Sequence, residues 1–207
     1  DRLIPDPQGH GMAHADLVLE AIYEDPDAKR QLLATIESRA QPHAVIASNT
    51  SSLRIEDLRT ALQRPERLVG IHFFNPVVLM PLVEVIEAPG VDGSVLQQAM
   101  QFVRAIDKLP LPVKSAPGFL VNAVLAPYML AAMRKVDSKV SAHSIDQAIL
   151  DFGMPMGPLM LADTVGLDIV LAAGRSLTPD ASTDAVPQCL QDRVSAGHLG
   201  KKTGQGF

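Results

Sequence analysis

The sequence is poor in cysteine, in aromatic residues and in basic residues. Cys189 is the single cysteine among 207 residues, tryptophan is absent, and aromatic residues make up 4%. One cysteine cannot form an internal disulfide, which favours a reducing compartment, so we expect a cytoplasmic protein. Lysine and arginine number 18 against 23 acidic residues, for a formal net charge of −5 with no basic block. Nucleic acid is therefore not an expected partner.

The sequence also lacks a signal peptide and a hydrophobic run long enough to cross a membrane. Its longest apolar run, 119–133, falls short of about 18 residues and contains Asn122 and Pro127. With 47% hydrophobic residues, the chain can bury a core in one large or two small domains. The chain starts with the polar segment DRLIPDPQGHGM and stops at GKKTGQGF without a final helix or strand. We therefore expect a fragment of a longer protein.

Strand patterns alternate with helix patterns over residues 1–114. The predicted helices begin with typical entry residues, such as Pro26 in the first and an Asn/Thr/Ser run before the second. This alternation predicts an α/β domain with a largely parallel sheet. The predicted strands are 15–22, 43–48, 68–74, 81–87 and 109–114, and the predicted helices are 26–40, 51–62 and 93–107.

The composition changes at SAPGFLVN, residues 115–122, after which no strand pattern appears. Pro127 should kink the first helix of this part, Gly153 should follow the end of the second, and Gly166 should divide or bend the third. We therefore predict an α/β domain over 1–114 and an all-helical domain over 115–207. The predicted helices of the second domain are 118–136, 141–152, 159–177 and 184–196.

Two apolar runs, LVGIHFF and PLVEVIE, each hold one polar residue where a buried strand should hold none. Their link is too short for a crossover helix, which needs about a dozen residues, so the runs should form an antiparallel hairpin. Its midpoint near Val78 places His72 opposite Glu84, about 5 Å apart. A carboxylate beside an imidazole fixes one ring tautomer and stabilises the imidazolium, as a general base requires. The alternative for His72 is a core histidine satisfied by its neighbours.

Polar clusters follow three of the predicted strands at their carboxyl ends, where open parallel sheets bind ligands. Glu24 and Lys29 follow the first strand, residues 48–52 (SNTSS) follow the second, and His72 with Asn75 lies at the exit of the third. Although distant in sequence, these groups should share one edge of the sheet. The structural alternatives are an ordinary helix-start pair for Glu24 and Lys29 and a capping turn for SNTSS.

Six motifs, in this order, are similar to those of the L-3-hydroxyacyl-CoA dehydrogenase family: SNTSSL, GIHFFNP, LVEVI, PGFLVN, GMPMGPLMLAD and GKKTGQGF. The resemblance covers the chain from about Ala15 onward. The family includes the stand-alone enzymes of fatty-acid β-oxidation and the dehydrogenase part of multifunctional α subunits. The resemblance implies reversible oxidation of (S)-3-hydroxyacyl-CoA to 3-ketoacyl-CoA with NAD. It also implies that the helical domain carries homodimer contacts and closes over the acyl chain.

The resemblance also implies residue roles. His72 would be the catalytic base for the proton of the 3-hydroxyl group, and Glu84 would orient it. Ser51 would lie beside the nicotinamide and the substrate, and Asn122 would help to position the reacting oxygen. The residues that match the family's contacts to NAD are Glu24, Lys29, Ser51, Asn75 and Lys202. No metal is expected, because His10 and His14 have the spacing of a zinc helix but lack the glutamate of H-E-x-x-H.

One part of the family pattern is missing from the sequence. The family begins with a strand–GxGxxG–helix unit that cradles the NAD pyrophosphate, and no such motif occurs here. We therefore expect an incomplete Rossmann-like, doubly wound sheet, and a chain that alone binds NAD poorly and does not turn over. Two other functions stay open: a non-catalytic dimerisation or crystallin-like relative, and a dehydrogenase for a free hydroxy acid. The His72–Glu84 pair disfavours the first, and the HFFNP pattern disfavours the second.

Overall fold

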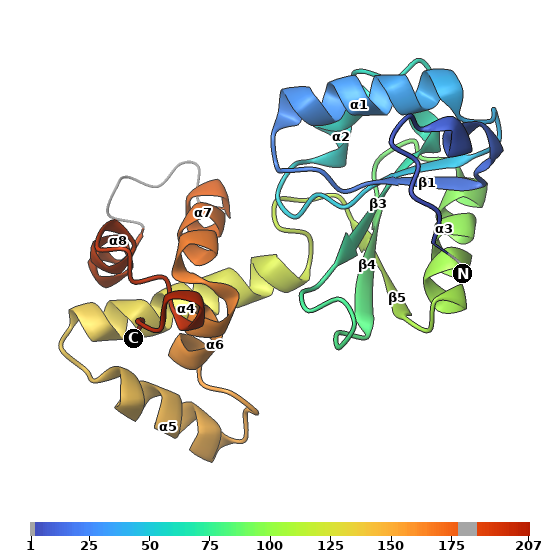
Figure 1. Ribbon diagram of the computed structural model, residues 1–207. Coiled ribbons are helices and arrows are strands. Elements are labelled where there is room, and N and C mark those ends of the chain that lie inside the picture. Colours follow the sequence, from blue (N-terminus) through green and yellow to red (C-terminus); the bar gives the residue numbers. More distant parts are fainter. Residues whose placement is uncertain (1–2, 178–185) are drawn as a thin grey trace. The chain divides into compact units, whose positions relative to one another are not determined.

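The computed structural model describes residues 3–177 and 186–207 and divides the chain into two compact units, 1–120 and 121–207. Figure 1 shows a sheet with helices in the first unit and helices alone in the second. The division falls after Leu120, beyond the boundary expected after residue 114. Residues 115–120 stay with the first unit because Phe119 packs into its core and the Leu120 amide donates to Glu84.

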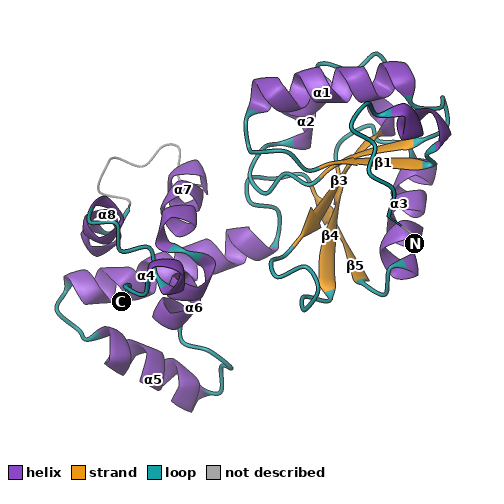
Figure 2. Ribbon diagram, in the orientation of Figure 1, coloured by secondary structure: helices purple, strands orange, loops and turns teal. Residues whose placement is uncertain are grey.

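The strands of the first unit are β1 (Leu17–Glu20), β2 (Val45–Ser48), β3 (Leu68–Phe73), β4 (Leu82–Glu87) and β5 (Leu109–Lys114). They form one sheet, drawn in orange in Figure 2, and their order in it is β1-β2-β3-β4-β5. The strands β1, β2 and β3 are parallel, β4 runs antiparallel to β3, and β5 is parallel to β4. The prediction of a largely parallel sheet with one hairpin is confirmed.

Three α-helices cover the sheet: α1 (Pro26–Arg39) and α2 (Ile55–Arg59) on one face, and α3 (Gly93–Ala105) on the other (Figure 1). Two 3₁₀ turns, η1 (His10–His14) and η2 (Pro65–Arg67), complete the described elements of this unit. Successive strand residues point to opposite faces, so Ile46 packs with α1 and α2 while Val45 packs with α3. The sheet is therefore the buried middle layer of three.

The hairpin of β3 and β4 has the register expected from its midpoint. His72 lies directly opposite Glu84, and Gly70 lies opposite Ile86. A β-carbon at Gly70 would come within 2.8 Å of Ile86 and 3.0 Å of Ile55. Glycine at this position therefore lets α2 pack closely over the hairpin, and the predicted apposition of His72 and Glu84 is confirmed.

The strand β1 and the helix α2 are each at most half as long as the sequence predicted. The strand β1 covers Leu17–Glu20 instead of 15–22, and α2 covers Ile55–Arg59 instead of 51–62. The start of the predicted helix is wrong because the amides of Ser51 and Ser52 donate to the carboxylate of Glu24, from a different part of the chain. Glu24 fixes a separate turn here, and the extended Arg54 lies between this turn and the helix. Helix-entry composition alone does not reveal such a distant acceptor.

The α-helices described in the second unit are α4 (Val121–Asp137), α5 (Ala142–Phe152), α6 (Pro158–Val165), α7 (Leu167–Leu177) and α8 (Gln188–Ser195), followed by the 3₁₀ turn η4 (Lys201–Thr203). Pro127 lies inside α4, Gly153 follows α5, and Gly166 separates α6 from α7. The helix predicted over 184–196 is present as α8, while residues 184–185 lie outside the described part. Within the described residues, no helix is both long enough and apolar enough to cross a membrane.

The C-terminal GKKTGQGF segment is held against α6 by Asp163. Both carboxylate oxygens of Asp163 accept from the Phe207 amide, at 3.1 and 3.0 Å. The Phe207 ring lies under the guanidinium of Arg193, 4.1 Å from the ring centroid. A β-carbon at Gly206 would meet Asp163 at 2.0 Å, so glycine is required for this close approach. These contacts fix the tail that carries Lys202.

Candidate active site at the carboxyl edge of the sheet

The carboxyl ends of β1, β2 and β3 carry buried polar side chains on one face of the sheet. Strand alternation turns Glu20, Ser48 and His72 toward the layer of α1 and α2, and the antiparallel β4 brings Glu84 to the same place. All four residues are buried. Buried polar groups need hydrogen-bond partners. His72 pairs with Glu84 in one cluster, and Glu20 accepts from Ser48 and Lys29 beside a second cluster around Glu24.

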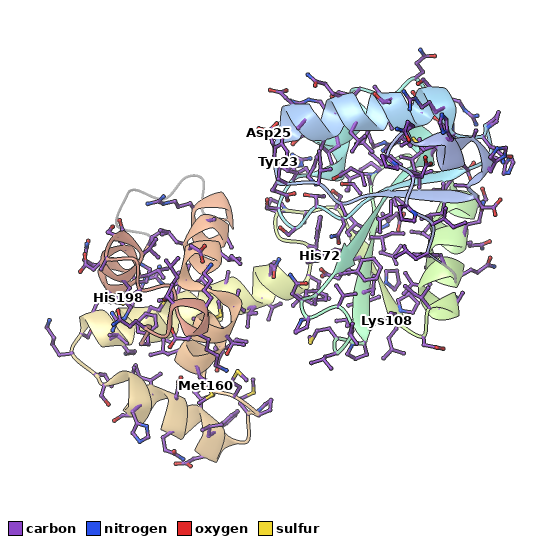
Figure 3. All side chains as sticks on the ribbon, in the orientation of Figure 1. Tyr23, Asp25, His72, Lys108, Met160 and His198 are labelled. Atoms are coloured by element: carbon purple, nitrogen blue, oxygen red, sulfur yellow. The ribbon has the colours of Figure 1, made fainter. Side chains whose placement is uncertain are left out.

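In the His72 cluster, the carboxylate of Glu84 holds the imidazole of His72, which is labelled in Figure 3. His72 Nδ1 lies 2.8 Å from Glu84 Oε2, and the two side chains are 7% and 0% exposed. The second oxygen, Glu84 Oε1, accepts from the Leu120 amide at 2.9 Å. A carboxylate at Nδ1 favours the tautomer in which Nδ1 carries the proton, so that Nε2 presents a lone pair. The ring is therefore arranged to accept a proton at Nε2.

Two aromatic rings flank the imidazole of His72. The Phe74 ring lies edge-on with its centroid 4.6 Å away, and the Phe119 ring lies 5.7 Å away. Phe119 is buried, and its backbone is in the left-handed region at a φ of 53°, which is uncommon for a residue with a β-carbon. These apolar walls limit the access of water to the His72–Glu84 pair, which strengthens the interaction between them. Sequence reasoning did not single out Phe119, although it follows Gly118 in the PGF motif.

The Glu24 cluster organises the turn that follows β2. Glu24 Oε1 accepts from the Thr50 hydroxyl at 2.5 Å and from the amides of Ser51 and Ser52 at 2.9 and 3.0 Å. Burial alone would raise the pKa of Glu24, but the hydrogen bonds from Thr50, Ser51 and Ser52 and the charge of Lys29 hold this pKa below its usual range. Glu24 is therefore an ionised acceptor that fixes the turn and leaves Ser51 exposed at the edge.

Asn49 links the ends of the three parallel strands. Its side-chain oxygen accepts from the Phe73 amide at 3.0 Å, and Phe73 follows His72 directly in β3. The amide of Asn49 in turn donates to the Glu20 carbonyl oxygen at 2.8 Å. The ends of β1, β2 and β3 are thereby joined by hydrogen bonds beyond the regular ladder.

Lys29 lies beneath the Glu24 cluster and does not reach the surface. Its side chain is 1% exposed, and its ammonium pairs with Glu20 at 2.7 Å and with Glu24 at 3.3 Å. Glu20 was missed by sequence reasoning, which treated it as one residue of a buried apolar strand. The available signal was a carboxylate inside an apolar run, with one lysine a short distance along the chain. Tyr23 and Asp25, the neighbours of Glu24 in sequence, are labelled in Figure 3.

Asn75 begins the turn between β3 and β4 and is exposed. The tip of this turn is apolar and open, with Val78 and Leu79 exposed at 88% and 75%. Lys108 (Figure 3) stabilises the backbone of this turn, because its ammonium donates to the carbonyl oxygens of Val77 and Met80 at 2.6 and 2.9 Å. The first unit thus presents Asn75 and an apolar tip beside the strand that carries His72.

Two predicted site residues belong to the second unit. Asn122 is the second residue of α4 and is half-buried. Lys202 lies in η4, is exposed and donates to Asp168, whose pKa it holds below the usual range. The other six predicted site residues, His72, Glu84, Ser51, Glu24, Lys29 and Asn75, all lie in the first unit.

Cysteine and the paired N-terminal histidines take no part in this site. Cys189 is buried and donates to the Met133 carbonyl oxygen, and burial raises the pKa of its thiol to about 12. His10 and His14 are exposed residues of η1. Among the described residues, no group of three potential ligands could hold a metal ion.

Comparison with known proteins identifies the two units. Residues 2–116 match the family model for the NAD-binding domain of 3-hydroxyacyl-CoA dehydrogenase, and residues 118–207 match the model for its C-terminal domain. FadB2 of Mycobacterium tuberculosis is 35% identical, with a TM-score of 0.90 over 96% of this chain and 72% of that one. The (S)-3-hydroxybutyryl-CoA dehydrogenase PaaH1 of Ralstonia eutropha is also 35% identical, with a TM-score of 0.90 and coverage of 97% and 72%.

A longer relative gives the same result. The 3-hydroxybutyryl-CoA dehydrogenase of Escherichia coli K12 is 38% identical, with a TM-score of 0.92 over 99% of this chain. The chain spans 44% of the length of that structure. The family models, these structures and the buried His72–Glu84 pair agree with the resemblance noted in the sequence motifs. The chain belongs to the 3-hydroxyacyl-CoA dehydrogenase family of NAD-dependent oxidoreductases.

Proposed function

We propose that this chain is part of a longer protein that interconverts (S)-3-hydroxyacyl-CoA and 3-ketoacyl-CoA in fatty-acid β-oxidation, with His72 as the general base. The observation that carries the proposal is the 2.8 Å contact between His72 Nδ1 and the fully buried Glu84. A buried ion pair contributes little to stability, since desolvation offsets its attraction, so a purely structural protein gains little from it. The pair is better explained by proton transfer.

The residues present fit one end of NAD. The exposed Ser51 and Asn75 and the partly exposed Glu24 lie at the carboxyl edge of the parallel strands, the usual place for a dinucleotide. We propose that these three residues hold the nicotinamide and its ribose, with Lys202 as a further contact. NAD, when bound, supplies the hydride acceptor. The GxGxxG cradle for the pyrophosphate does not occur in this sequence, and we assign it to the remainder of the longer protein.

In the proposed mechanism, the substrate hydroxyl is placed at Nε2 of His72. This nitrogen takes the hydroxyl proton while C3 loses its hydrogen as hydride. Glu84 stabilises the imidazolium that results and keeps the ring oriented. In the reverse direction, the same nitrogen returns the proton to the oxygen. Ser51 and Asn122 are proposed to donate hydrogen bonds to the reacting oxygen, so that it is held at hydrogen-bonding distance from the base.

The test is to express the 207-residue chain and the longer protein and to assay both with 3-hydroxybutyryl-CoA and NAD. We expect NADH formation by the longer protein and none above background by the chain alone, because the chain lacks the pyrophosphate-binding motif. Oxidation by the chain alone would contradict the assignment of that motif to a missing part. An inactive longer protein would instead favour a non-catalytic relative of the same fold.

We further propose a homodimer formed through the helical unit and a cytoplasmic location. The helix α5 has no buried residue, although one of its faces is apolar. Phe152 at its end is 84% exposed, and Met154 and Met160 nearby are each 43% exposed. Such a face in a folded protein is typical of a subunit interface. A single cysteine, which cannot form an internal disulfide, supports the location.

Replacing Phe152 by glutamate should convert the proposed dimer to a monomer, because the charge would be buried unpaired in an apolar interface. The molar mass in light scattering measures this directly. Leu109→Glu in β5 is a matched control, since Leu109 is also an exposed apolar residue, at 62%, but lies in the first unit. A wild-type protein that is monomeric at micromolar concentration would refute the proposal.

A further inference from the structure

The turn between β3 and β4 carries no buried side chain. Residues 75–81 are all exposed. Within the turn, the Pro76 carbonyl oxygen accepts from the amides of Leu79 and Met80 at 2.9 and 3.0 Å. A segment with few buried apolar contacts opens at little cost in free energy. Packing against the core therefore does not fix this turn, although it begins at Asn75, a proposed contact of the nicotinamide.

The ammonium of Lys108 holds the turn by its backbone (Figure 3). It makes three hydrogen bonds, to the carbonyl oxygens of Val77, Val78 and Met80 at 2.6, 3.5 and 2.9 Å. A hydrogen bond from a charged donor is stronger than one between neutral groups. Three carbonyl oxygens of one short, exposed turn therefore share a single charged donor.

The backbone of Lys108 is itself fixed where α3 ends and β5 begins. Its amide donates to the Val103 carbonyl oxygen at 3.1 Å, and the Asp107 amide donates to the Arg104 carbonyl oxygen at 3.0 Å. Asp107 lies in the left-handed region at a φ of 58°, so these two bonds form a Schellman motif at the end of the helix. Lys108 therefore reaches the turn from a backbone position that the helix and the sheet determine.

We infer that Lys108 is a positioning residue for the cofactor site, because it holds the turn 75–81 where Asn75 can meet the nicotinamide. The inference rests on the proposed function, in which Asn75 is a contact of NAD. Lys108 acts through the backbone of the turn, and Asn75 is the residue that meets the ligand. A turn that is already in place when NAD arrives does not have to be ordered on binding, which favours affinity.

The first experiment measures the turn in the 207-residue chain by amide hydrogen exchange. Lys108→Met keeps an unbranched apolar side chain but removes the three donors. We expect exchange at Leu79 and Met80, whose amides donate within the turn, to accelerate about tenfold, while exchange in the β3–β4 ladder stays unchanged. Unchanged exchange at both amides would overturn the inference.

The matched control for this experiment is Lys114→Met. Lys114 is the last residue of β5, whereas Lys108 directly precedes this strand. The ammonium of Lys114 pairs with Glu87 at 2.8 Å, and its side chain is 79% exposed. The control removes the same charge without touching the turn, so exchange at Leu79 and Met80 should match the wild type. Equal acceleration would attribute the effect to the lost charge, and would count against Lys108.

The second experiment measures the cofactor site in the longer protein by steady-state kinetics. Because the turn would have to be ordered on binding, Lys108→Met should raise the KM for NAD about tenfold and leave the KM for 3-hydroxybutyryl-CoA within about twofold of the wild type. Lys114→Met should match the wild type in both constants. An unchanged KM for NAD, or an equal rise in both constants, would refute the inference.

A double-mutant cycle separates the positioning of Asn75 from a general effect on the fold. If Lys108 acts through Asn75, Lys108→Met should raise the KM for NAD by less than about twofold in an Asn75→Ala background. A rise of about tenfold in that background would show that Lys108 acts elsewhere, and would overturn the inference. If the wild-type longer protein is inactive, the proposed function fails, while hydrogen exchange still decides whether Lys108 holds the turn.

Discussion

Replacing His72 by glutamine in the longer protein is expected to lower kcat for 3-hydroxyacyl-CoA oxidation by about 10²–10⁴-fold. Glutamine is close to histidine in size, but its amide cannot accept and return a proton near neutral pH. The loss should fall on kcat with little change in the KM of the substrate, because the proton is transferred only in the transition state. Steady-state kinetics with 3-hydroxybutyryl-CoA measures both constants.

His43→Gln provides a matched control for this result. His43 precedes β2, is exposed, and lies 3.8 Å from Asp16 on the surface, outside the His72 cluster. The control variant should retain the activity of the wild type. If the His72 variant turned over at the rate of the His43 variant, His72 would not be the base.

Glu84→Gln should lower kcat by about 10²-fold although the side chain keeps its shape. In the native protein, both carboxylate oxygens accept: Oε2 from His72 and Oε1 from the Leu120 amide. Glutamine has one oxygen and one NH₂ group, so one of these partners must face a donor. If the NH₂ group faces Nδ1, the ring protonates at Nε2 and the base is lost. If it faces Leu120, a buried amide loses its acceptor.

The neighbouring Glu87→Gln variant makes the comparison specific. Glu87 lies on the same strand, but it pairs with Lys114 at 2.8 Å and is partly exposed. Exposed ion pairs contribute about 0–1 kcal/mol, so this variant should match the wild type in kcat and nearly in stability. Glu84→Gln should also lower the free energy of unfolding by about 1–3 kcal/mol, as measured by urea denaturation. Equal behaviour of the two variants would remove the support for Glu84.

The hairpin could be predicted from the sequence because its determinants are local. Two apolar runs, a short link and a residue count on either side of Val78 were enough to set His72 opposite Glu84. The division of the helices at Gly153 and Gly166 was similarly local, since glycine is the residue that most readily adopts a positive φ. Patterns of this kind need no knowledge of the rest of the fold.

The buried partners could not be predicted, because they depend on contacts between distant segments. The spacing of Glu24 and Lys29 does not show that the lysine points inward to Glu20. Nor does the composition of SNTSS show that Glu24 takes its amides and shortens the following helix. Phe119 likewise reaches the His72 ring only when the segment before α4 returns to the sheet.

The length of the turn between β3 and β4 constrains how this family member can vary. Side chains alternate between faces along a strand, so a one-residue insertion or deletion that shifts the pairing would place Val83 or Val85 opposite His72. Aliphatic side chains would then take the place of the carboxylate, and Glu84 would be turned toward the α3 core. Substitutions at the open tip, around Val78, leave the pairing intact. The residues at the tip of this turn can therefore vary in identity, whereas a change in their number that shifts the pairing separates His72 from the carboxylate of Glu84.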